Sequence, residues 1–244
     1  MIKRLFMLAV SAAIVLAFGP AAHATPLKQI WIPSTDVEPF KSVHLDVDLY
    51  TTMFKKIKDG GHTRPVTLGL TVGVLETQFI DGEIGVDFKE ATDEPTFFNA
   101  KLAIKEDSLL TFFPAIAFGA YDMGTKQDVT DYNIFYVLAS KTIAPLGRLS
   151  AGYYVGNDKL LRNTKNDKEN NGALLSFDRT LAEINKNLWV AVDYMSGQNV
   201  YGALSFGLGW RFSPNISAIA GYNAYNERKL AGEDTFTIQF DMDF

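Results

Sequence analysis

The chain has 244 residues, no cysteine and a formal net charge of −5, and 47% of its residues are hydrophobic. Without cysteine it forms no disulfides and holds no metal through thiolates. An acidic chain also lacks the basic surface that nucleic-acid binding needs, so we expect no nucleic-acid partner.

The N-terminus has the pattern of an export signal. Two cations, Lys3 and Arg4, precede an apolar run of about 14 residues and an Ala-His-Ala motif at 22–24. The run is shorter than the roughly 20 residues of a membrane-spanning helix. We therefore predict a secretory signal peptide over residues 1–24, cleaved before Thr25, which would take the net charge from −5 to −7.

Residues 25–41, "TPLKQIWIPSTDVEPFK", contain three prolines and no sustained hydrophobic period. Such a stretch is typical of extended chain. We predict that it forms an N-terminal periplasmic arm.

Strict alternation of apolar and polar residues begins at residue 42. The stretches "SVHLDVDLY" and "VTLGLTVGV" both follow the two-residue period of a strand with one apolar face. Most of the predicted strands are 8–12 residues long, which suits transmembrane strands of about 9–11 residues better than the five or six of globular proteins. The twelve predicted strands cover 42–50, 66–74, 82–89, 97–105, 114–122, 131–141, 147–156, 171–179, 187–196, 201–212, 215–225 and 234–244.

The connections between these strands alternate in length. Long polar segments such as "GNDKLLRNTKNDKENN" alternate with short ones such as "IAPL" and "SPN". Outer-membrane barrels have this asymmetry, with long loops outside the cell and short periplasmic turns.

The last strand, "DTFTIQFDMDF", alternates to the final residue. Together with the signal peptide and the strand series, it resembles the Gram-negative outer-membrane β-barrel (porin-like) superfamily, over residues 42–244. The resemblance implies an all-β fold: a transmembrane, antiparallel, up-and-down β-barrel of about 12 strands in the cell outer membrane, surrounded by outer-membrane lipids. It also implies that the barrel-assembly machinery reads the apolar residues of the last strand, which are Phe236, Ile238, Phe240, Met242 and Phe244.

The apolar faces are expected to point outward. Twelve strands enclose more space than a soluble eight-stranded barrel, and an apolar lining would leave it as a large dry hole. Aromatic residues on the apolar face near strand ends fit the girdles of membrane barrels. They are Tyr132, Tyr136, Tyr153, Tyr194, Trp210, Phe212, Tyr222 and Phe244.

The polar faces then supply charges to the lumen. These charges could form a constriction that selects solutes or a salt-bridge network that fills the interior, and the strand number favours neither over the other. The lumen-lining candidates are His44, Asp46, Asp48, Asp87, Lys101, Lys141, Arg148, Asp193, Arg211, Asp241 and Asp243.

We therefore predict a narrow passive channel for small hydrophilic solutes rather than an enzyme. One alternative is a non-conducting structural or surface-interaction barrel. Another is a barrel-type hydrolase with His44 as base beside Asp46 or Asp48, but a lipid-cleaving site should face the bilayer and His44 falls on the lumen face. The sequence has no histidine pair at metal-ligand spacing and no phosphate-binding glycine motif, so we predict no metal site and no cofactor.

Overall fold

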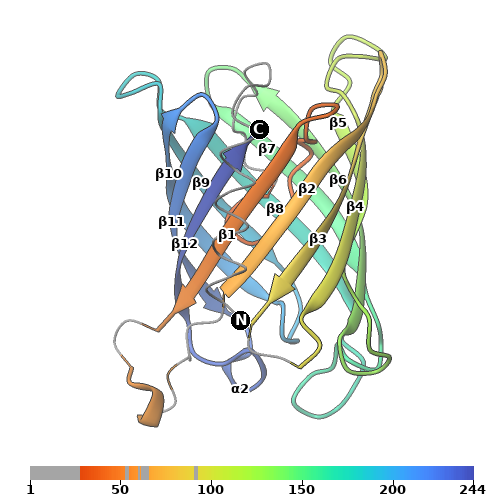
Figure 1. Cartoon of the computed structure of the whole chain (residues 1–244), viewed down its shortest axis with the longest axis vertical. Coiled ribbons are helices and arrows are strands. Elements are labelled where there is room, and N and C mark those ends of the chain that lie inside the picture. The colour runs from red at the N-terminus through yellow and green to blue at the C-terminus, as the bar shows by residue number, and fades with distance from the viewer. Residues whose placement is uncertain (1–27, 53–54, 60, 62–65, 91–92) are drawn as a thin grey trace.

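A computed structural model gives the structure of the chain, except for residues 1–27, 53–54, 60, 62–65 and 91–92. Twelve antiparallel strands follow one another around a closed barrel (Figure 1), which confirms the predicted fold class. The predicted signal peptide lies outside the described residues. The strands are β1 (Val43–Thr51), β2 (Val66–Glu76), β3 (Ile80–Lys89), β4 (Thr96–Ile104), β5 (Ala115–Gly124), β6 (Asp131–Ile143), β7 (Gly147–Val155), β8 (Asn171–Thr180), β9 (Leu188–Met195), β10 (Ala203–Ser213), β11 (Ile216–Tyr225) and β12 (Thr235–Asp243).

Among the described residues, two helical elements occur, and both are short and lie in connections between strands. They are the 3₁₀ helix η1 (Ile57–Asp59) and the helix α2 (Arg228–Ala231). In the described part of the chain, no helix has the length and apolar character needed to cross a membrane.

The last strand closes the barrel by pairing with the first. β12 pairs with β1 from His44 opposite Asp243 to Thr51 opposite Phe236. Beyond the strand, the backbone N–H of Val43 donates to the Phe244 carbonyl at 3.0 Å, and the Phe244 N–H donates back to the Val43 carbonyl at 2.9 Å. The seam therefore covers the edge that each of these two strands would otherwise leave open.

The outer surface of the barrel is apolar, as the alternation predicts. Phe118, Phe135, Phe206 and Phe240 are each about half exposed, at 53%, 53%, 50% and 46%. An apolar band of this kind suits contact with lipid chains. Inward residues of the same strands, such as Ala117, Leu138, Ser205 and Gln239, are buried.

Strand β6 corrects the predicted orientation of two tyrosines. Ile134, Tyr136 and Leu138 are buried inside the barrel, whereas Phe135 and Val137 are exposed on the outside. Tyr132 also packs against the interior cluster, so neither Tyr132 nor Tyr136 belongs to an outer girdle. Both faces of this strand are apolar, and alternation alone therefore could not tell which face points outward.

Replacing Phe240 and Phe244 by Ser should reduce the amount of folded, heat-modifiable protein in outer-membrane fractions. Phe240 lies on the lipid-facing side of β12, and Phe244 ends the seam with β1. Each exposed Phe contributes about 1.5–3 kcal/mol when apolar surroundings cover it. The matched control is Phe206→Ser with Phe212→Ser, which removes two outward rings from β10. Equal loss in both variants would argue against a special role of the C-terminal strand in assembly.

Candidate solute site in the barrel lumen

The arm before β1 lies inside the barrel. Ile30 and Ile32 have no exposed surface, and their neighbours Gln29 and Ser34 are 1% exposed. The arm turns back on itself, with a bridge between Lys28 and Pro33. The sequence predicts a periplasmic arm over residues 25–41; in the structure, residues 28–38 lie in the lumen and residues 39–41 are exposed.

Hydrogen bonds to the wall hold the backbone of the arm. One carboxylate oxygen of Asp193 accepts the N–H groups of Ile30 at 2.7 Å and Trp31 at 3.0 Å. The side-chain amide of Gln239 donates to the Ile30 carbonyl at 2.8 Å. Backbone groups without a strand partner need such acceptors and donors when they are buried. Asp193, predicted to line the lumen, therefore binds the arm.

Two cations of the wall, Arg148 and Lys101, hold the middle of the arm. Arg148 contacts Asp178 at 2.9 Å on the neighbouring strand and Asp36 of the arm at 2.7 Å. Lys101 contacts Glu83 at 2.9 Å, and both side chains are 5% exposed. Lys101 also donates to the Asp36 carbonyl, and Glu83 accepts the N–H of Glu38 at 2.6 Å. These pairs are part of the salt-bridge network that the sequence analysis considered as an alternative to a constriction.

Apolar side chains fill one side of the lumen. Ile32 of the arm packs with inward residues of strands β4 to β9, including Leu138 and Leu174. Ile30 approaches the wall where Gly207 and Gly221 leave space, since a Cβ atom on either glycine would lie 2.8 Å from the Ile30 side chain. The lumen is thus shaped to receive the arm.

Next to this apolar cluster the lumen retains a cavity of about 430 Å³. Trp31 at the turn of the arm forms one wall and makes edge-on contacts with Tyr50 and Tyr225, at ring distances of 5.8 and 5.6 Å. Tyr121, Tyr132, Tyr136 and Tyr201 add further aromatic surface. The charged lining consists of Asp46, Asp48, Glu83, Asp87, Glu90, Asp122 and Asp241 with Lys28, Lys89 and Lys101.

Most of the predicted lumen residues lie on the inner side of the wall. His44, Asp46, Asp48, Lys101, Asp193, Asp241 and Asp243 are at most 9% exposed. Asp87 lines the cavity and accepts a hydrogen bond from Asn99 at 3.2 Å. Arg211 is half-buried opposite Ser217, whose hydroxyl donates to Asp241 inside the barrel at 3.2 Å.

Lys141 is the exception, and the prediction that it lines the lumen is wrong. It belongs to the outward set of β6 and pairs with Glu106 at 2.9 Å and Asp107 at 2.7 Å, in the connection after β4. The same misjudged face of β6 explains this error and the two misplaced tyrosines. Lys141 therefore does not contribute to a charged constriction in the lumen.

Sequence reasoning missed Trp31, Tyr201 and Tyr225 as parts of the site. Trp31 donates from its indole N–H to the Tyr201 carbonyl at 2.8 Å, which fixes the turn of the arm against the wall. The signal available in the sequence was the apolar triplet Ile30-Trp31-Ile32 in an arm expected to be exposed. An exposed arm has no reason to carry three large apolar residues in succession.

The polar partners of His44 are all carboxylates among the residues that the structure describes. Asp243 lies 2.6 Å from Nδ1, Asp241 lies 3.4 Å from Nε2, and Glu38 lies 3.9 Å from Nδ1. A serine hydroxyl is not among these partners. The arrangement offers no nucleophile for the Ser-His chemistry of the hydrolase alternative.

Several solved outer-membrane proteins are similar to the chain in fold. The KdgM porin matches with a TM-score of 0.53 at 8% sequence identity, over 83% of this chain and 99% of that one. The NanC porin matches with a TM-score of 0.50 at 15% identity, over 82% and 98%. The chain therefore shares the closed β-barrel fold of these porins. At these identities the likeness concerns the fold alone.

The barrel is also similar in fold to a phospholipase. Outer-membrane phospholipase A from Escherichia coli matches with a TM-score of 0.50 at 11% identity, over 86% of this chain and 94% of that one. The fold therefore does not by itself separate channels from enzymes. No protein-family model matches the sequence, and no curated protein matches it either.

Proposed function

We propose that this outer-membrane barrel is a narrow passive channel for small hydrophilic solutes, closed in the described conformation by its own arm. The cavity of about 430 Å³ carries the proposal, since charged groups and tyrosines line it inside a closed barrel. A solute that entered it would meet polar groups along the wall. Movement of the arm would then open the remainder of the lumen.

The charge of the lining favours cationic or neutral solutes. Seven carboxylates and three lysines line the cavity, an excess of four negative charges when His44 is neutral. Aromatic faces such as that of Trp31 attract cations as well. The KdgM porin has been solved in complex with oligogalacturonate, whose carboxylates would be repelled by a lining of this kind.

The filled lumen supports one alternative, a non-conducting barrel that acts through its surface loops. In that case the arm would be a permanent part of the core, and refolded protein would give no conductance steps. Planar-bilayer recording separates the two functions directly. The hydrolase alternative receives no support from the carboxylate partners of His44.

Asp87→Asn should shift a conducting barrel toward anions. The change removes one negative charge from the cavity and nearly preserves side-chain volume, and the Asn99 hydrogen bond retains an acceptor. The shift in reversal potential under a salt gradient should be largest at low salt, because screening over about 8–10 Å weakens the effect at physiological ionic strength and above. Asp128→Asn in a connecting loop is the matched control, since this exposed residue pairs with Lys159 outside the cavity. An equal shift in both variants would show that overall charge, rather than the cavity, sets the selectivity.

A further inference from the structure

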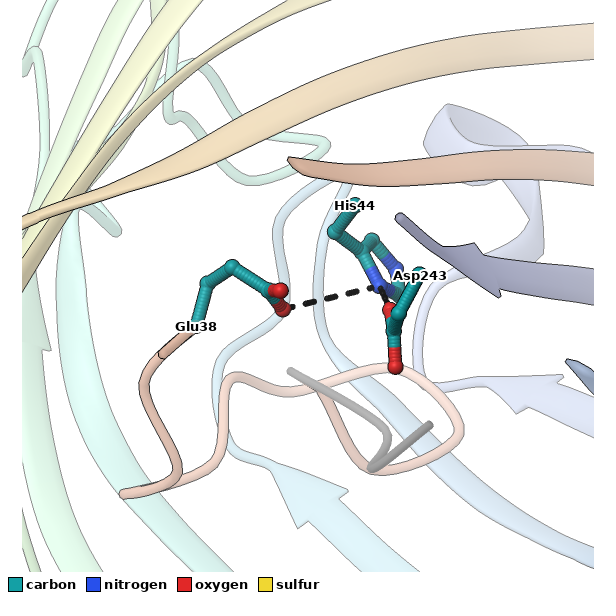
Figure 2. Close-up of side chains that lie close together, drawn as sticks. All are labelled: Glu38, His44 and Asp243. Atoms are coloured by element: carbon teal, nitrogen blue, oxygen red, sulfur yellow. Dashed lines mark hydrogen bonds and ion pairs between the residues drawn. The ribbon is translucent and has the colours of Figure 1, made fainter. Parts of the chain in front are cut away.

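Three segments that are distant in the sequence meet at the seam of the barrel. Glu38 of the arm, His44 of β1 and Asp243 of β12 each offer one ligand atom, and these atoms lie within 4.8 Å of one another. Figure 2 shows the two carboxylates pointing toward the imidazole ring. The Nδ1 atom of His44 lies 2.6 Å from Asp243 Oδ1 and 3.9 Å from Glu38 Oε2.

Two carboxylate oxygens in this cluster have no hydrogen-bond partner among the described residues. They are Oε1 of Glu38 and Oδ2 of Asp243, and both residues are only 1% exposed. Burying charged oxygens without a partner costs several kcal/mol. These two oxygens give the cluster acceptor capacity that a cation could use.

The charge of the cluster specifies a cation. With Asp241, three carboxylates surround one imidazole, so even a protonated His44 would leave an excess of two negative charges. The lysines that enter the lumen nearby are engaged elsewhere. Lys28 pairs with Asp46 and Asp48, and Lys101 pairs with Glu83.

In the structure, Nδ1 of His44 donates to Oδ1 of Asp243 at 2.6 Å, and Nε2 lies 3.4 Å from Oδ1 of Asp241. A bound cation would replace the proton on Nδ1, and an N–H on Nε2 would then point at Asp241. A carboxylate behind a ligating histidine is the usual arrangement around protein-bound zinc. Asp241 is thus a positioning residue for His44.

We propose that Glu38, His44 and Asp243 bind one divalent cation of the zinc class, which fastens the arm to the closing seam of the barrel. One imidazole nitrogen and two carboxylate oxygens form a ligand set that suits Zn²⁺, with a fourth position left for water. Mg²⁺ and Ca²⁺ prefer six or more oxygen ligands and do not favour imidazole.

The distances are compatible with this ion. Zinc–ligand bonds of about 2.0–2.2 Å place the ligand atoms of a tetrahedral site about 3.3–3.6 Å apart. The two separations from Nδ1, 2.6 and 3.9 Å, lie on either side of that range. Small side-chain rotations would therefore complete the site without any change in the register of β1 and β12. The site does not depend on whether the barrel conducts.

Zinc titration of the refolded full-length mature chain, after treatment with a chelator, tests the proposal. Calorimetry should show one Zn²⁺ per chain, bound in the presence of excess Mg²⁺. Glu38→Gln, which lies outside every strand, should abolish this stoichiometric binding. Asp241→Asn should weaken it by about 10–100-fold, the usual effect of removing a carboxylate behind a ligating histidine. Glu106→Gln, an exposed carboxylate in the connection after β4, is the control and should bind like the wild type.

A second variant, with a spectroscopic readout, tests the site even if one of the ligand substitutions above impairs folding. The chain has no cysteine, so His44→Cys introduces its one thiol, and Co²⁺ bound at this position should give a thiolate-to-cobalt charge-transfer band. That band should disappear in the double variant that combines His44→Cys with Glu38→Gln. The proposal is overturned if wild-type protein binds no Zn²⁺, if Glu38→Gln binds it as tightly as wild type, or if the cobalt band is absent from folded protein.

Discussion

Deleting residues 28–38 should convert the barrel into an open pore with a several-fold larger single-channel conductance. These residues occupy the lumen, where Ile30 and Ile32 are fully buried and Asp193 and Gln239 bind the backbone. The strands pair with one another and not with this part of the arm, so the barrel should still close. Without the arm, the space that it fills inside the twelve-stranded wall would become an open passage for ions.

Planar-bilayer recording of refolded protein measures this effect. The matched control is deletion of residues 163–167 from the long loop between β7 and β8. That segment forms its own turn, in which Asn163 donates to the Asp167 carbonyl at 3.0 Å, and it lies outside the strands. The arm deletion should raise conductance and the loop deletion should not. Equal conductance in the two variants would contradict the role of the arm as a plug.

The strands could be predicted from the sequence because the membrane imposes a strict rule. Each strand must present apolar residues to lipid, so a two-residue period persists through all twelve strands. Every predicted boundary agrees with the observed strand to within two residues, as for β8, expected at 171–179 and found at Asn171–Thr180. Strand β6 carries apolar residues on both faces, so the rule does not tell its inner face from its outer face. The predicted orientation of this strand was therefore wrong.

The position of the arm could not be predicted because nothing local encodes it. Residues 28–41 form no strand of the barrel wall, and their prolines are compatible with any extended path. The arm fits the lumen because the inner surface of the wall is complementary to it. That surface is formed by strands far along the chain. Asp193, which binds the arm backbone, is more than 160 residues away from Ile30.

The cluster of Glu38, His44 and Asp243 at the seam could not be predicted from local sequence either. The sequence predicts no metal site because it has no cysteine and no histidine pair at metal-ligand spacing. Glu38 and His44 are close in sequence, but Asp243 reaches them only because β12 pairs with β1. Barrel closure thus joins the first and last strands into one site, and that juxtaposition follows from topology rather than from spacing.

Replacing Lys101 by Met should destabilise the barrel strongly. Lys101 and Glu83 form an ion pair of 2.9 Å with both side chains 5% exposed, and the same two residues bind the arm at Asp36 and Glu38. Removing the lysine leaves the Glu83 carboxylate buried without its cation. Breaking a buried pair in this way costs about 3–5 kcal/mol, so the urea unfolding midpoint of the refolded protein should fall clearly.

The double variant Lys101→Met with Glu83→Gln should recover much of that loss. The glutamine carries no charge, yet its carbonyl oxygen can still accept the Glu38 N–H that Glu83 accepts at 2.6 Å. The exposed pair of Lys126 and Glu94, 3.1 Å apart with side chains 56% and 39% exposed, supplies the control. Lys126→Met should change stability by only about 0–1 kcal/mol, because water solvates both charges. If Lys101→Met were no more costly than Lys126→Met, water would reach Glu83 in solution, and the arm would not seal this side of the lumen.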